Sequence, residues 1–84
     1  MIKEELLRES TAAQIFKRFG LKKKLVSKSD AEDDKIDEIE DELRSNGFKR
    51  EELDSEYEYM YVKGNEKVRI HYRYTNGYQA IWIL

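Results

Sequence analysis

Residues 56–84 read EYEYMYVKGNEKVRIHYRYTNGYQAIWIL, and this stretch decides the fold. Apolar and aromatic residues alternate with polar ones, a period of two that is typical of β-strands. Gly64-Asn65 suits a type II′ hairpin and Asn76-Gly77 a type I′ hairpin, because glycine and asparagine accept the positive φ angles that these turns need. The stretch therefore predicts a three-stranded antiparallel β-meander.

The two turns also predict a register, and the register sorts the side chains onto two faces. Two-residue loops place Tyr61 opposite Val68 in the first hairpin and Tyr72 opposite Ile81 in the second. One face then carries the residues that helices would cover: Tyr57, Tyr59, Tyr61, Val68, Ile70, Tyr72, Tyr74, Ile81 and Ile83. The other face carries Glu58, Met60, Val62, Lys67, Arg69, His71, Arg73, Ala80, Trp82 and Leu84.

The first half of the chain has the pattern of helices. Apolar residues before Gly20 recur at spacings of three, four and seven, and this glycine marks a helix end. A second helix is clearer, because Ser29-x-x-Glu32 has the form of a capping box at its start. Asn46-Gly47 suits its end.

These segments together predict an α+β fold in a single domain, residues 1–84. Two or three helices within residues 1–48 pack on one face of the C-terminal three-stranded antiparallel meander over residues 56–84. Residues 21–29 are expected to form a basic connector, and residues 49–55 a short helical turn or loop.

The composition excludes several classes of protein. The chain has 84 residues with no cysteine and one histidine, so it has no disulfide and no thiolate or multi-histidine metal site. It contains no apolar run long enough to cross a membrane, no nucleophile elbow and no phosphate-binding loop. We expect a cytoplasmic protein that is not an enzyme and uses no cofactor or metal. The composition also suits a virus or mobile element.

The second sheet face is the candidate binding surface. It combines apolar, basic and aromatic side chains, a composition typical of binding hot spots: Met60, Val62, Arg69, His71, Arg73 and Trp82. An indole beside guanidinium groups suits cation–π contacts or stacking on a base. We expect this face to bind a macromolecular partner, with a protein as the first choice. A homodimer is the alternative, through this face or through edge-to-edge pairing of the last strand.

Two other hypotheses involve nucleic acid. Residues 11–28, TAAQIFKRFGLKKKLVSK, resemble a helix-turn-helix in which Gly20 forms the turn. That motif would direct a set of lysines toward DNA: Lys22, Lys23, Lys24 and Lys28. The acidic run at residues 29–42 would repel phosphates, which favours a protein partner. The same acidic helix suggests the remaining hypothesis, a mimic of nucleic acid that inhibits a DNA-binding protein.

Overall fold

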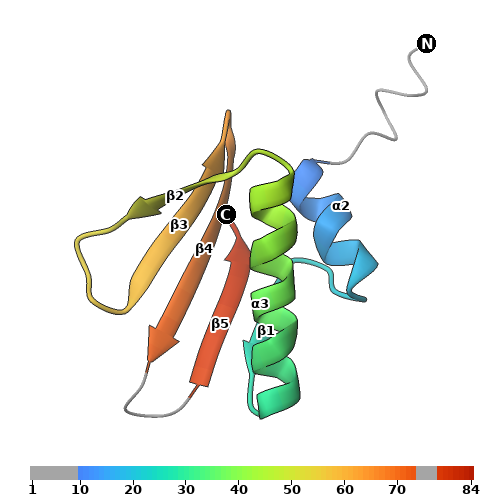
Figure 1. The fold of residues 1–84 in the computed structure, drawn as a ribbon, viewed down its shortest axis with the longest axis vertical. Coiled ribbons are helices and arrows are strands. Elements are labelled where there is room, and N and C mark those ends of the chain that lie inside the picture. The colour runs from blue at the N-terminus through green and yellow to red at the C-terminus, as the bar shows by residue number, and fades with distance from the viewer. Residues whose placement is uncertain (1–9, 74–77) are drawn as a thin grey trace.

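The computed structural model describes residues 10–73 and 78–84, and these residues form two helices and five strands. Helix α2 spans Thr11–Arg18 and helix α3 spans Asp30–Ser45. The strands are β1 (Lys24–Ser27), β2 (Lys49–Glu52), β3 (Glu58–Lys63), β4 (Glu66–Arg73) and β5 (Tyr78–Ile83). They build one antiparallel sheet in the order β1-β5-β4-β3-β2, with both helices on one side of it (Figure 1).

This architecture corrects the three-stranded meander expected from the sequence. The short strands β1 and β2 extend the sheet at its two edges, where a connector and a helical turn or loop were expected. In β1, Leu25 lies opposite Ile81 of β5, and in β2, Arg50 lies opposite Tyr61 of β3. Both strands form because the outer strands of a meander leave backbone N–H and C=O groups that a neighbouring segment can pair with. The last strand, expected at an edge, is therefore internal.

The two described helices begin and end at the signals in the sequence. The Ser10 hydroxyl accepts the Ala13 N–H at 3.0 Å and caps α2. Ser29 caps α3 by accepting the Glu32 N–H at 3.3 Å. At the other end of α3, Gly47 has φ of 91°, which a residue with a side chain rarely adopts. The helix expected before Ser10 lies outside the described residues.

The first hairpin has the predicted register. Tyr61 lies opposite Val68, and the two-residue loop begins at Gly64 with φ of 59°. No described residue other than glycine has a positive φ, so Asn65 has a negative φ, as a type II′ turn requires. The prediction is confirmed for this hairpin.

The second hairpin is shifted by two residues from the predicted register. Tyr72 lies opposite Gln79 instead of Ile81, and Arg73 lies opposite Tyr78. The predicted Asn76-Gly77 turn lies outside the described residues. Because the shift is an even number of residues, the described side chains of β4 and β5 stay on their predicted faces.

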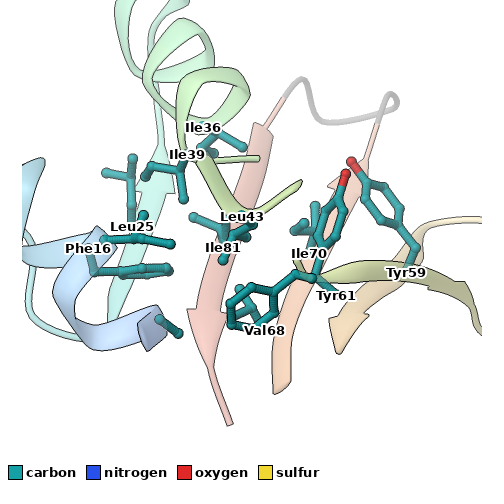
Figure 2. Close-up of a cluster of buried hydrophobic side chains, with 13 residues drawn as sticks. Phe16, Leu25, Ile36, Ile39, Leu43, Tyr59, Tyr61, Val68, Ile70 and Ile81 are labelled. Carbon is teal, nitrogen blue, oxygen red and sulfur yellow. The ribbon is translucent and has the colours of Figure 1, made fainter. Parts of the chain in front are cut away.

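The hydrophobic core lies between the helices and one sheet face (Figure 2). Helix α3 contributes the apolar stripe Ile36, Ile39 and Leu43, and its spacing of three and four places these side chains on one side of the helix. They pack with fully buried residues from α2 and the sheet: Ala12, Ile15, Phe16, Tyr61, Val68, Ile70 and Ile81. This packing leaves the opposite sheet face for other contacts.

Candidate functional site

The sheet face opposite the helices is the candidate site, and we call it the open face. No described helix lies on it (Figure 1). Successive side chains of a strand point to opposite faces, so every second residue of each strand lies on the open face. The described residues on it are Lys24, Val26, Lys49, Glu51, Glu58, Met60, Val62, Lys67, Arg69, His71, Ala80 and Trp82. The open face therefore mixes apolar, aromatic and basic groups.

The structure brings together five of the six side chains expected to bind a partner: Met60, Val62, Arg69, His71 and Trp82. All five are half-buried. Met60 lies opposite Arg69, and Arg69 lies opposite Trp82, which lies opposite Lys24. This row crosses four strands. The shifted hairpin places Arg69 beside Trp82, where His71 was expected. Arg73 belongs to the same strand as Arg69, but its side chain lies outside the described residues.

A hollow of about 410 Å³ opens on this face beside Trp82. It is lined by Lys24, Val26, His71, Ala80 and Trp82. Ala80 lies between Val26 and His71 in its cross-strand row, so a single methyl group separates two larger side chains. The hollow has the size of a small ligand site and a mainly apolar lining. It can accept an apolar or aromatic side chain.

The Glu58 carboxylate contacts two basic side chains of the open face, Arg69 and His71. Glu58 Oε1 accepts a hydrogen bond from Arg69 Nε at 2.7 Å, and Glu58 Oε2 lies 3.1 Å from His71 Nδ1. Burial opposes the ionisation of Glu58, but hydrogen bonds and charge from Arg69 and His71 outweigh it and hold its pKa below the ordinary value. The guanidinium of Arg69 is therefore held in place and largely neutralised.

The lysines assigned to DNA binding lie around β1 and not on a recognition helix. Lys22, Lys23, Lys24 and Lys28 are all exposed. The helix-turn-helix hypothesis is wrong, because Lys24–Ser27 is a strand that pairs with β5. Leu25 and Ser27 are buried while Lys24 is exposed, the period of two that a strand requires. The lysines instead make one edge of the sheet basic.

A large group of acidic residues lies in the helix layer, on the other side of the sheet from the open face. Helix α3 carries nine carboxylates, of which only Glu40 is buried. The exposed ones are Asp30, Asp34, Asp37, Glu38 and Asp41. The charge blocks of the sequence thus become two surfaces, an acidic helix layer and a basic sheet edge.

A buried polar cluster between α3 and β3 was not predicted from the sequence. Glu40 is 7% exposed, and the Tyr59 hydroxyl lies 2.9 Å and 3.0 Å from its two carboxylate oxygens. Tyr61 donates to Glu40 Oε1 at 3.0 Å and accepts from Arg44 at 2.6 Å. In Figure 2 both tyrosine hydroxyls point toward the same end of the core. The cluster ties the central turns of α3 to the sheet.

Burial determines the ionisation of this cluster. It raises the pKa of Glu40, and hydrogen bonds from Tyr59 and Tyr61 only partly oppose the shift. Burial and the neighbouring carboxylate also raise the pKa of both tyrosines, so their hydroxyls remain donors. A cleft of about 440 Å³ adjoins the cluster and is lined by Asp37, Glu40, Asp41, Arg44, Tyr59, Tyr72 and Gln79. The polar atoms of Glu40 and the two tyrosines bond to each other and to Arg44, so the cluster has a structural role.

The part of the chain that the structure describes shows neither a metal site nor a membrane-spanning helix. No group of its histidine and acidic residues could hold a metal ion. No described helix is long and apolar enough to cross a membrane. Comparison of the chain with protein-family models, curated proteins and solved structures found no match. The geometry of the open face is therefore the basis for assigning a function.

Proposed function

We propose that this chain is a non-enzymatic protein-binding module whose open face binds an acidic partner polypeptide. The observation that carries the proposal is the row of Met60, Arg69, Trp82 and Lys24, with the hollow beside it. Tryptophan, methionine and arginine are enriched at the centre of protein interfaces, where they fill desolvated pockets. The lack of cysteine favours action in the reducing cytoplasm.

Charge favours an acidic partner. On the open face, four basic residues (Lys24, Lys49, Lys67 and Arg69) stand against two acidic ones (Glu51 and Glu58), a formal charge of +2 with His71 neutral. Helix α3 has nine acids against Lys35 and Arg44, a formal charge of −7. An acidic partner is therefore attracted to the open face and repelled by the helix layer.

Two features favour a protein over a nucleic acid. Affinity for a phosphate backbone rises with the number of cations that can replace counterions, and Arg69 is already paired with Glu58. Proteins that hold single strands stack successive bases on several aromatic rings, whereas Trp82 is the only aromatic side chain described on the open face. The open face therefore suits a partner segment in which one apolar residue enters the hollow and the neighbouring residues are acidic.

The experiment is a selection of random peptides displayed on phage against the protein, followed by binding assays with Trp82→Ala and Tyr57→Ala. Tyr57 is 41% exposed and lies off the open face, so it is the matched control. We expect acidic peptides that bind Tyr57→Ala normally and lose about 2 kcal/mol, or roughly thirtyfold, on Trp82→Ala. The proposal fails if no peptide is enriched or if enriched peptides bind both variants equally.

A labelled mixed-sequence oligonucleotide tests the competing partner class. Fluorescence anisotropy is measured at low and near-physiological salt with the wild type and Trp82→Ala. We expect at most weak binding that salt abolishes, because contacts between exposed lysines and phosphates depend on the release of counterions. Binding that persists near physiological salt and depends on Trp82 would replace the protein partner with nucleic acid.

A further inference from the structure

The two edges of the sheet are protected to different degrees. All four residues of β2 are charged and exposed, and charged edge strands discourage pairing with another chain. In β1 only Lys24 is exposed, whereas Val26 is half-buried and both Leu25 and Ser27 are buried. The β1 edge also borders the hollow beside Trp82, because Lys24 and Val26 line it.

The backbone of β1 presents unpaired groups at this edge. Ile83 N donates to Lys23 O at 2.9 Å, so these residues form a hydrogen-bonded pair. Hydrogen-bonded and non-hydrogen-bonded pairs alternate in an antiparallel ladder, so Leu25 and Ser27 also direct their backbone groups toward β5. The N–H and C=O groups of Lys24 and Val26 therefore point away from the sheet. The next outward N–H, that of Lys28, donates to Glu32 Oε1 at 2.7 Å.

From this edge geometry we infer that an extended acidic segment of a partner protein adds to β1 as a sixth strand. Backbone groups of Lys24 and Val26 would supply the hydrogen bonds, as in other cases of strand addition. The inference rests on the proposed function and specifies how the partner reaches the open face. The added strand would place alternate side chains beside the hollow.

The edge also specifies a sequence pattern for the partner. A side chain opposite Val26 on the open-face side lies next to the hollow, which suits an aromatic residue. The residues two positions before and after it lie opposite Lys24 and Lys28, two exposed cations. Opposite charges in cross-strand positions stabilise pairing. The segment therefore has the pattern acid-x-aromatic-x-acid, where x is any residue.

A second copy of the chain fits this edge poorly. Pairing of two β1 strands would bring the lysines around both strands together, and like charges across a strand pair are destabilising. The acidic residues of α3 do not substitute, because their backbone groups are already bonded within the helix. The occupant is therefore an extended segment of a different protein.

The probe for this inference is a short, fluorescently labelled, terminally blocked peptide with a central phenylalanine and glutamates two positions on either side. Two N-methylated versions of this peptide are made. The first is methylated at the backbone amides of the phenylalanine and the glutamates, and the second at the amides of the residues between them. All strand pairs in the sheet are antiparallel, so we expect only the first version to lose binding, by at least tenfold. Equal effects of the two versions, large or small, or no binding of the parent peptide, would overturn strand addition.

A protein variant tests the same edge from the other side. Val26→Pro removes an N–H that the sheet does not use, and Val26→Thr keeps it with a similar side-chain shape. We expect at least tenfold weaker peptide binding for the proline variant only, with unfolding of both variants followed by Trp82 fluorescence. If Trp82→Ala weakens binding and Val26→Pro does not, the open face binds without strand addition and only this inference fails. If neither weakens binding, the proposed function fails at this probe as well.

Discussion

Replacing Tyr61 with phenylalanine tests whether the buried cluster of Glu40, Tyr59 and Tyr61 stabilises the fold. The substitution keeps the fully buried ring and removes only the hydroxyl that donates to Glu40 and accepts from Arg44. Glu40, which is 7% exposed, would then keep the hydroxyl of Tyr59 as its remaining tyrosine donor. Loss of one hydrogen bond to a buried charged group costs about 1–3 kcal/mol. We expect Tyr61→Phe to lower the free energy of unfolding by that amount.

The effect should also depend on pH. Burial raises the pKa of Glu40 in the folded state, so this group stabilises the fold fully below its unfolded pKa and loses that contribution as pH rises through the folded pKa. Without the Tyr61 hydroxyl, the folded pKa rises further. Tyr61→Phe should therefore cost more at pH 7 than near pH 4, where the carboxyl is protonated.

Urea unfolding, followed by the fluorescence of Trp82, gives both quantities, with Tyr57→Phe as the control. Tyr57 is 41% exposed, and its hydroxyl has no hydrogen bond to a described residue, so its loss should cost under about 0.5 kcal/mol. A Tyr61→Phe cost equal to the control, or one that does not fall at lower pH, would refute the assigned role of the cluster.

Two further predictions concern the sheet itself. Arg69 and His71 hold the pKa of Glu58 low, so Glu58 stabilises the fold above its ordinary pKa and loses this contribution as pH falls through the folded pKa. Glu58→Gln should therefore cost roughly 1 kcal/mol at pH 7 and progressively less as the pH is lowered, and a pH-independent difference would contradict the ion cluster. Gly64→Ala should cost about 1–2 kcal/mol by urea unfolding, because φ of 59° is strained for alanine while a Cβ there meets no atom within 4 Å; an unchanged midpoint would contradict the type II′ turn.

The sequence pattern predicted those helices and strands whose stabilising contacts lie within a short segment of the chain. The first hairpin is confirmed because strand alternation and the Gly64 turn both lie within the same short segment. β2 has no alternation at all, since its four residues are charged and exposed. It forms through pairing with β3, and the Arg50 guanidinium lies 3.8 Å from the centre of the Tyr59 ring. Such non-local contacts are not visible in a window of four residues.

The candidate site was partly predictable for the same reason. The register of the second hairpin was predicted wrongly by two residues, but a shift by an even number leaves each side chain on the same face. Met60, Arg69 and Trp82 therefore lie together on one face, as predicted. Val26 was absent from the predicted site because β1 was expected to be a connector. Its partner strand, β5, is more than fifty residues away in sequence.

The position of Glu40 in the sequence indicates that its side chain is buried. It follows Ile36 by four residues and precedes Leu43 by three, so it lies on the apolar stripe of α3. Tyr59 and Tyr61 were already expected on the sheet face that the helices cover. A carboxylate on a buried stripe opposite tyrosines needs hydrogen-bond donors, and the tyrosine hydroxyls are the nearest ones. The two observations together predict the cluster that the structure contains.

The acidic residues of α3 and the lysines around β1 determine where an acidic partner approaches the molecule, but charge alone does not select that partner. The acidic layer on α3 repels an acidic chain, and the lysines around β1 attract it, so encounters are biased toward the β1 edge. Exposed lysines contribute little affinity each, and any acidic chain would satisfy them. Selection must come from groups with fixed geometry, which are the outward backbone groups of Lys24 and Val26 and the hollow beside Trp82. An acidic helix offers no free backbone groups to this edge, and an extended acidic chain without an aromatic residue leaves the hollow empty. Only a segment that meets both conditions uses every feature of the site.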